Sequence, residues 1–344
     1  LGDLYFNGEL APKHMGKAYE YFLKASQNGS GYGSYSCGFI LMKGSADIPR
    51  DIEKGLSMFR LAVDQNYKAA TRDLARYYYS LETEEDNRKA LDYYLQYIEY
   101  NPKDTDTLLH IGLIYESGLG VPLNIDLARR YYERAAEQDE TGMAYNFLGG
   151  TYMNDEETEN NERKAVHYFQ KAIELGNTNA MFRISYYLHN GKGGLQVDIP
   201  REIELLTEAS KRGNHQATYR LGLLFEDNES GMAQNLELSV KYFQLAADNG
   251  ILAAINKMGE LYLFGEVIPA NLTKAISCFT AASEQGYGKA SYWLGRLHTD
   301  GIGQLEKDTQ KAMNYYRKAI EQGYEEAREW MEQLQKNLVD ETIT

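Results

Sequence analysis

A short pair, an apolar residue followed by a small one, recurs at a fixed interval along this chain of 344 residues. It begins at Leu1-Gly2 and returns every 36 or 37 residues until Met331-Glu332, where the pattern degenerates. The pairs between these ends are Cys37-Gly38, Leu74-Ala75, Ile111-Gly112, Leu148-Gly149, Ile184-Ser185, Leu221-Gly222, Met258-Gly259 and Leu294-Gly295. A period of this length marks a repeat protein, in which each unit buries its apolar face only against its neighbours. The repeat therefore favours a solenoid, and it favours binding over catalysis.

The copy over residues 215–250 shows the repeating unit most clearly. Leu221 and Gly222 lie on one face of a first helix, helix A, with a small residue where a neighbour must approach closely. The polar, glycine-containing stretch 227–235 predicts a loop. An amphipathic helix B follows and ends at Gly250, which suits a left-handed cap. Each copy is therefore predicted to be a pair of helices.

The fourth copy carries the fullest version of the motif. From Ile111 it reads Ile-Gly-Leu-Ile-Tyr-Glu-Ser-Gly-Leu-Gly-Val, followed by Leu127-Ala128, Tyr131-Tyr132 and Ala135-Ala136. This pattern resembles the Sel1-like repeat family, whose members are related to tetratricopeptide repeats. The third copy departs from it locally, because residues 79–88 lack the glycines.

The resemblance implies an all-α fold: a right-handed α-α superhelical solenoid of about nine Sel1-like helix pairs and a C-terminal capping helix. It covers residues 1–344, which we expect to form a single solenoid. A polar outer face around Trp330 suits the terminal cap. The expected copies are 1–30, 31–67, 68–102, 103–139, 140–177, 178–214, 215–250, 251–287 and 288–324, with the cap helix at 325–344.

Charge and hydropathy restrict the partners. The net charge of -14 opposes the attraction to phosphate on which nucleic-acid binding depends, and no basic stripe interrupts it. We therefore expect no nucleic-acid partner, and a protein or peptide partner of basic or mixed charge. No apolar run is long enough to cross a bilayer, so we expect no direct membrane insertion by this segment.

Cysteine usage and the chain start say little about compartment. Cys37 and Cys278 lie more than six repeats apart, which is too far for a disulfide in a solenoid, so both are expected to be core residues. The chain begins inside a repeat and without an initiator Met. We expect that its natural N-terminus has been removed, together with any targeting segment, and the localisation stays unknown.

The repeat register names candidate binding residues. By analogy with tetratricopeptide repeats, helix A should line the inner, concave surface, with side chains exposed two before, two after and five after the Leu position. Aromatic residues and Arg recur there, and these residue types dominate binding energy at protein interfaces. The candidate groove residues are Tyr35, Phe39, Arg72, Arg76, Tyr79, Phe182, Tyr186, His189, Tyr219, Tyr292 and Arg296.

Packing is the alternative role for these aromatic residues. We expect Tyr35, Tyr186, Tyr219 and Tyr292 to be among the anchors for an extended or helical partner segment. A periodic aromatic two residues before the Leu position can equally pack between neighbouring A helices.

The polar loops carry weaker signals. Two acidic stretches, 82–86 and 155–162, are expected to be solvated loops between helices A and B. The residues Glu226, Asn228, Ser230, Gly231 and Glu237 have the spacing of a calcium-binding loop. Its first position is Glu where Asp is needed, so we predict no metal there.

Nothing in the sequence predicts catalysis or a cofactor. The six histidines fall in different copies, and none has a metal-binding or nucleophile-activating spacing with cysteine or carboxylates. The sequence therefore predicts a non-catalytic scaffold or adaptor that binds a partner segment in its groove. The alternative is a regulatory or recruiting domain of a larger enzyme or of an envelope or membrane-associated complex, with the chemistry outside this fragment.

Overall fold

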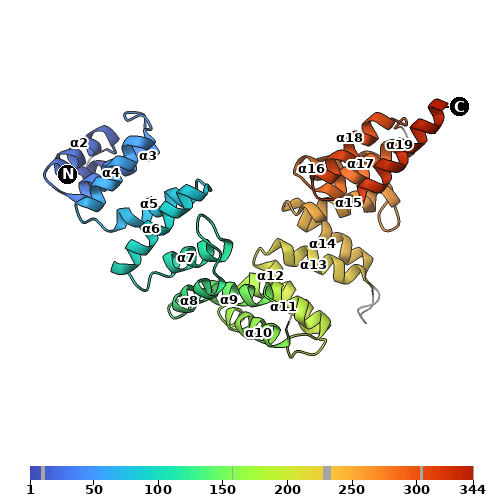
Figure 1. Ribbon diagram of the computed structural model, residues 1–344, viewed down its shortest axis with the longest axis horizontal. Helices are drawn as coiled ribbons and strands as arrows, with labels where there is room; N and C mark the ends of the chain where they lie inside the picture. The colour runs from blue at the N-terminus through green and yellow to red at the C-terminus, as the bar shows by residue number, and fades with distance from the viewer. Residues whose placement is uncertain (9–11, 157, 228–233, 303–304, 344) are drawn as a thin grey trace. The chain divides into compact units, whose positions relative to one another are not determined.

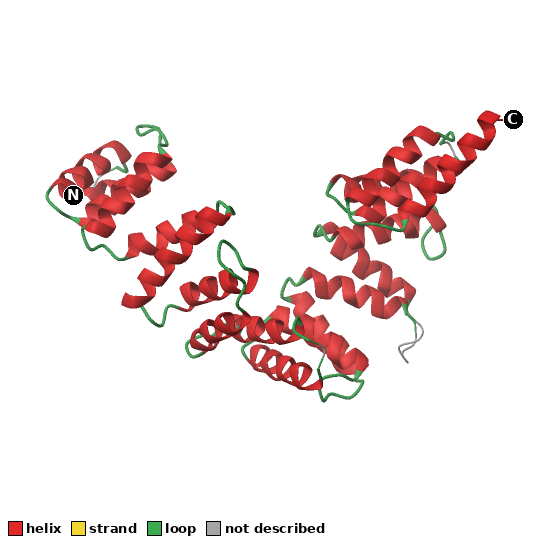
Figure 2. Cartoon of the chain, viewed as in Figure 1, coloured by secondary structure: helices red, strands yellow, loops and turns green. Residues whose placement is uncertain are grey.

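The computed structural model describes residues 1–8, 12–156, 158–227, 234–302 and 305–343. In this part of the chain all regular structure is α-helical, with nineteen helices and no strand (Figures 1 and 2). The odd-numbered helices up to α17 are the A helices of the repeats, and the even-numbered ones are the B helices. The predicted all-α fold of nine helix pairs followed by one C-terminal helix is confirmed.

The A helices are α1 (Gly2–Asn7), α3 (Gly31–Lys43), α5 (Ala69–Tyr79), α7 (Thr105–Ser117), α9 (Met143–Met153), α11 (Thr178–Asn190), α13 (His215–Glu226), α15 (Leu252–Phe264) and α17 (Gly288–Asp300). The B helices are α2 (Met15–Gln27), α4 (Ile52–Asp64), α6 (Glu84–Tyr100), α8 (Ile125–Ala136), α10 (Glu159–Glu174), α12 (Ile199–Lys211), α14 (Leu236–Asp248), α16 (Leu272–Glu284) and α18 (Thr309–Glu321). The last helix is α19 (Ala327–Ile343).

The helices divide into two compact units, Leu1–Asn177 and Thr178–Thr344. Within each unit, every helix packs against the next one along the chain, as Figure 1 shows for α3 with α4 and for α17 with α18. The continuity of the two units as one solenoid stays a prediction.

The small residue of the recurring pair allows helix B to approach helix A. A Cβ on Gly222 would lie 2.6 Å from Cδ1 and Cε1 of Phe243, and one on Gly149 would lie equally close to Phe169. Real Cβ atoms do not approach carbon this closely, so any larger residue at Gly222 or Gly149 would displace the facing ring. The predicted packing role of these glycines is confirmed.

Side chains define where each B helix begins. In all nine B helices the residue before the first turn accepts a hydrogen bond from the backbone N–H three positions later, as Asn124 does from Leu127 at 3.0 Å. Such a cap satisfies a backbone donor that the helix itself leaves unpaired. Six of the B helices are followed by glycine at positive φ, for example Gly250 at 81°. The predicted glycine ends of helix B are confirmed.

The two acidic stretches are not loops throughout, and this prediction was wrong. Residues 84–86 form the first turn of α6, which Thr83 caps, and residues 159–162 form the first turn of α10. Carboxylates are stabilised at a helix N-terminus because they face the positive end of the helix dipole. The acidic clusters therefore help these two B helices to begin early.

Both cysteines are free thiols. Cys37 is buried in α3, where burial raises its pKa to about 12, and Cys278 is half-buried in α16. A thiol held protonated by burial is a poor nucleophile. In the described residues, no helix is both long enough and apolar enough to span a membrane.

Candidate functional site

The predicted groove residues all lie on A helices. In the first unit, α3 carries Tyr35 and Phe39, and α5 carries Arg72, Arg76 and Tyr79. In the second unit, the candidates are Phe182, Tyr186 and His189 on α11, Tyr219 on α13, and Tyr292 and Arg296 on α17. We call the surface formed by these register positions the A-helix face, and describe it separately for each unit.

Tyr35 connects three helical segments of the first unit. Its ring stacks on Phe59 with centroids 5.3 Å apart and lies 4.9 Å from the ring of Tyr67. Its hydroxyl donates a hydrogen bond of 2.7 Å to Oδ2 of Asp73 on α5. Burial raises the pKa of Tyr35, so the hydroxyl stays protonated. Tyr35 is therefore half-buried and already engaged within the chain.

Two arginines of α5 reach the start of α7. Nη1 of Arg72 lies 3.5 Å from Oδ2 of Asp104, and Nη2 of Arg76 lies 2.6 Å from Oδ2 of Asp106. The hydrogen bond with Asp106 raises the pKa of Arg76. Both members of the Arg76 pair are 45% exposed, and an exposed pair contributes little stability. Arg76 is therefore available to exchange Asp106 for a partner's carboxylate at small cost.

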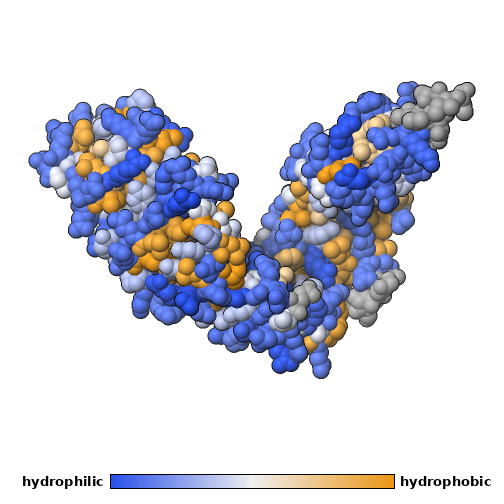
Figure 3. Space-filling view, viewed as in Figure 1, coloured by the Kyte–Doolittle hydropathy of each residue, from blue (hydrophilic) through white to orange (hydrophobic). Residues whose placement is uncertain are grey.

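Tyr79 ends α5 beside α7. Its ring meets that of His110 edge to face at 5.3 Å, and burial raises its pKa. With Asn87 and Leu119 it lines a small cavity in the first unit. Apolar side chains gather around α7 on the face that Figure 3 shows.

Phe39 and Tyr186 are the candidates whose rings reach solvent most. Phe39 is 40% exposed and Tyr186 is 41% exposed. The hydroxyl of Tyr186 accepts a hydrogen bond of 3.0 Å from Nζ of Lys192. Phe182, one turn earlier on α11, is half-buried. An exposed ring on a structured helix is a suitable contact point for another protein.

His189 belongs to a buried ionic cluster that the sequence did not predict. Its Nδ1 lies 3.0 Å from Oε2 of Glu202, whose side chain is fully buried in α12. The other carboxylate oxygen of Glu202 accepts from Nε and Nη2 of Arg220, each at 3.1 Å. Glu202 occupies a helix B position that is small in every other copy. Its counterparts are Ala18, Gly55, Ala90, Ala128, Ala165, Ser239, Ala275 and Ala312.

The remaining candidates pack within the second unit. Tyr219 lies 5.6 Å from Phe243, and burial raises its pKa to about 12. Tyr292 contacts several rings, including that of Trp330 at 6.3 Å. The guanidinium of Arg296 lies 3.8 Å from the Trp330 ring centroid, a cation–π contact that fixes α19 against α17. These side chains stabilise the fold, and their role in partner binding stays a prediction.

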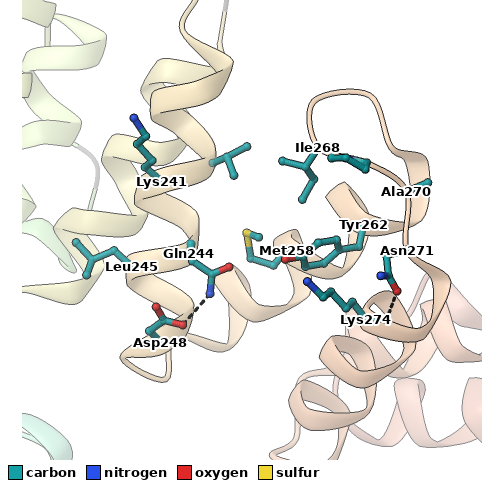
Figure 4. Close-up of a pocket in the computed structure, with 12 residues that line it drawn as sticks. Lys241, Gln244, Leu245, Asp248, Met258, Tyr262, Ile268, Ala270, Asn271 and Lys274 are labelled. Carbon is teal, nitrogen blue, oxygen red and sulfur yellow. Dashed lines mark hydrogen bonds between the residues drawn. The ribbon is translucent and has the colours of Figure 1, made fainter.

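A second cavity lies away from the A-helix face, between α14, α15 and the segment that joins α15 to α16. Its volume is about 610 Å³. Figure 4 shows Met258 and Tyr262 on one side of it and Leu245 on α14 on the other. Nζ of Lys274 lies 5.0 Å from the Tyr262 ring centroid. The lining holds no histidine or cysteine, and its charged side chains are Lys241, Asp248 and Lys274.

The titratable residues form no metal-binding cluster in the described ranges. No group of three His, Cys, Asp or Glu side chains there could hold a metal ion. His298 stacks on Tyr315 at 5.7 Å, and burial lowers its pKa. Of the residues with calcium-loop spacing, Asn228, Ser230 and Gly231 lie outside the described part of the chain.

Helix pairs that each pack on the next, with glycine at every close approach but two, define a helical-repeat protein. A family model described as Sel1 repeat matches residues 1–30, 32–67, 68–96, 107–140, 142–177, 178–214, 215–251, 252–287 and 288–324. The chain therefore belongs to the Sel1 repeat family. Proteins of this family are generally protein-interaction scaffolds, and the Sel1 solenoid is typically non-catalytic.

Two relatives match short parts of the chain. The Sel1-repeat-containing protein YjcO of Escherichia coli K12 is 33% identical over 78 residues, which are 22% of this chain and 34% of YjcO. Protein sel-1 homolog 2 of Rattus norvegicus is 40% identical over 70 residues, 20% of this chain and 10% of the homolog. The chain thus spans about a third of YjcO and a tenth of the rat protein.

Solved structures share the fold over most of the chain. A Sel1 repeat protein from Oxalobacter formigenes superposes with a TM-score of 0.69 at 24% identity, covering 92% of this chain and 90% of that protein. The protective antigen c5321 of uropathogenic Escherichia coli gives 0.59 at 20% identity, covering 98% and 79%. At these identities the likeness establishes the fold alone.

Proposed function

We propose that this protein is a non-catalytic scaffold that holds a segment of another protein on its A-helix face. The observation that carries the proposal is the placement of exposed aromatic side chains. Of the five in the described residues, Phe39 and Tyr186 lie at register positions of the A-helix face. Tyr32 and Phe264 lie elsewhere on A helices, and Tyr100 lies on a B helix. Large rings left in solvent on one class of helix favour that surface as the contact site.

Exposure divides the candidate residues by role. We assign the partner contacts first to Phe39, Arg76 and Tyr186. Each has an aromatic ring or a guanidinium group that is exposed to solvent. Tyr35, Tyr219 and Tyr292 are half-buried among rings of the chain itself, and we assign them to supporting the face. The four tyrosines chosen from the sequence are therefore unequal, and Tyr186 is the anchor among them.

Charge supports a basic or mixed-charge partner. The chain carries a net charge of -14, which attracts cationic protein surfaces and repels nucleic acid. Arg76 adds a local site for a partner carboxylate, because its own ion pair is exposed. We therefore propose a protein segment with positive charge overall and no nucleic-acid partner.

The alternative is a regulatory or recruiting domain of a larger enzyme or membrane-associated complex. A recruiting domain and a free-standing adaptor differ in whether the natural protein carries further domains. We propose that both would bind their partner through the A-helix face. In either case we propose no catalysis by this chain.

Site-specific photo-cross-linking tests the proposal. A benzophenone amino acid is placed at Phe39, Arg76 or Tyr186, and in matched variants at the exposed B-helix residues Glu53 and Lys211. The proteins are expressed in the source cells and irradiated. We expect the same partner to cross-link to the three A-helix positions and to neither B-helix position. A partner captured only from B-helix positions would refute the assignment.

A further inference from the structure

An aromatic pocket opens on the A-helix face of the first unit. It has a volume of about 180 Å³ and is lined by Phe6, Phe22, Tyr32, Tyr35, Phe39 and Ser36. Phe22 and Ser36 are buried and form its floor, whereas Tyr32 and Phe39 are 44% and 40% exposed and form its rim. Five of the six lining residues are therefore aromatic, and they come from three helices.

The rings are held at angles that leave space between them. Phe6 meets Phe22 and Phe39 edge to face, with centroids 6.3 and 6.1 Å apart and interplanar angles of 66°. Phe22 meets Tyr32 at 5.9 Å and 89°. These edge-to-face contacts fix the orientations of the rings that line the pocket.

The pocket has the electrostatics of a cation site. The faces of aromatic rings are electron-rich, and cages of such rings bind alkylated ammonium groups. Two carboxylates are hydrogen-bonded to the lining tyrosines and add negative charge near the pocket: the Tyr32 hydroxyl donates to Oδ1 of Asp3 at 2.5 Å, and the Tyr35 hydroxyl donates to Oδ2 of Asp73 at 2.7 Å. None of the lining residues is basic.

The same lining disfavours an unmodified lysine. A primary ammonium carries three N–H donors that need acceptors when they are buried. The pocket itself holds no carboxylate, and its polar lining groups are the Ser36 hydroxyl and two tyrosine hydroxyls. A trimethylated ammonium has no N–H donors, so it loses no hydrogen bonds to water when it enters the pocket, and its desolvation costs less free energy.

We infer that this pocket binds the methylated ammonium of a lysine side chain on the partner protein. The inference rests on the proposed function, because Tyr35 and Phe39 belong to the A-helix face. It adds the chemical class of one contact: an alkylated cation held between Phe39, Tyr32 and Phe6. Nζ of Lys13 lies 5.8 Å from the Phe6 ring centroid, so a bound cation shares that ring with Lys13.

Four small probes test the pocket by ligand-observed NMR titration of the full chain. They are the N-acetyl amide of trimethyllysine, the same amide of unmodified lysine, choline, and 3,3-dimethylbutan-1-ol, the neutral isostere of choline. We expect trimethyllysine to bind about tenfold more tightly than lysine, and choline about tenfold more tightly than its isostere. Equal affinity for choline and the isostere would overturn the cation site, and so would no binding by either cationic probe.

Ring variants keep the test independent of folding. Phe39→Leu retains apolar bulk at a 40% exposed position but removes the aromatic face, so trimethyllysine binding should fall about tenfold with an unchanged circular dichroism spectrum. Tyr32→Phe keeps the ring and loses the hydrogen bond to Asp3, so it should weaken binding only a few-fold. Phe264→Ala removes a 57% exposed ring of α15, outside the pocket, and should leave affinity unchanged. Unchanged affinity in Phe39→Leu would overturn the inference.

The failure of this inference is distinct from the failure of the proposed function. If Arg76 and Tyr186 cross-link a partner but trimethyllysine does not bind, only the pocket inference is wrong. If choline binds much more tightly than trimethyllysine, the pocket takes a small molecule and its assignment to a protein side chain is wrong.

Discussion

Gly222 on α13 and Phe243 on α14 are packed so closely that a Cβ on the glycine would lie 2.6 Å from two carbons of the ring. The Gly222→Ala substitution must therefore displace a ring that is completely buried. We expect a net loss of about 1–2 kcal/mol of stability, because overpacking outweighs the better helix propensity of alanine. Urea unfolding followed by circular dichroism measures the change.

A glycine that does not face a ring provides the matched control, and we expect its substitution not to reduce stability. Gly16 lies in the first turn of α2, and an added Cβ there would lie 3.3 Å from the His14 side chain and 3.5 Å from Cβ of Asp47, with no atom closer than 3.3 Å. We expect Gly16→Ala to be neutral or to stabilise the chain by up to about 1 kcal/mol. Equal destabilisation by both substitutions would mean that ring packing is not the reason for glycine at the recurring pair.

The buried Glu202 makes the second unit sensitive to loss of its partner Arg220. Arg220→Ala removes the guanidinium that pairs with a fully buried carboxylate and leaves the contact with His189 in place, and breaking a buried pair in this way costs about 3–5 kcal/mol. We expect Glu202→Ala to recover part of that loss when added to Arg220→Ala, because alanine is the usual residue at this position. Urea unfolding of the two single variants and the double variant gives the coupling energy.

An exposed ion pair supplies the control for that experiment. Arg201 and Glu204 lie on the surface of α12, with Nη1 2.5 Å from Oε2. We expect Arg201→Ala to change stability by less than about 1 kcal/mol. If Arg220→Ala cost no more than Arg201→Ala, the buried cluster would contribute nothing to the fold.

Tyr219 makes stability depend on alkaline pH. Burial raises its pKa from 10.0 to about 12, so the folded chain favours the protonated hydroxyl. This contribution is complete below pH 10 and is lost as pH rises through 12, because the unfolded chain releases the proton first. We expect Tyr219→Phe to move alkaline unfolding to higher pH, as followed by circular dichroism between pH 9 and 12.5. Tyr186→Phe changes an exposed ring and should leave the midpoint in place.

The side-chain caps of the B helices each contribute a small amount to the free energy of unfolding, which can be measured separately from ring packing. The side chain of Asn124 accepts the Leu127 N–H at 3.0 Å at the start of α8. Asn124→Ala should cost about 1 kcal/mol, and Asn124→Gly only a few tenths, since glycine is itself tolerated at this position. Thermal unfolding of both variants measures the difference, and equal losses would contradict the cap.

The recurring pair predicts the fold because the residue against which it packs lies nearby in the sequence. One small residue in helix A faces one ring in helix B of the same copy, so Gly222 and Phe243 can be matched from their spacing. The glycine ends of helix B are also local, since the chain direction there requires positive φ. The acidic starts of α6 and α10 are not predictable from charge alone, because a run of carboxylates is typical both of a solvated loop and of a helix N-terminus.

The site is less predictable, because it depends on contacts that differ between copies. The ionic cluster joins residues on three helices, and its one sequence signal was a glutamate, Glu202, where other copies carry alanine, glycine or serine. The aromatic pocket includes Tyr32, which lies at no register position, and Phe6, which lies five after Leu1 but is not among the candidate residues. The register names a surface, but it does not say which of its rings the chain itself covers.

The most direct test of the central claim compares two triple variants for affinity to the cross-linked partner. Phe39→Ala, Arg76→Ala and Tyr186→Ala together remove the exposed A-helix residues. Tyr100→Ala, Leu175→Ala and Leu245→Ala together remove equally exposed residues of B helices or their ends. We predict that calorimetry gives at least about a hundredfold loss for the first variant and less than twofold for the second. A large loss in the second variant with none in the first would contradict the A-helix face as the binding surface.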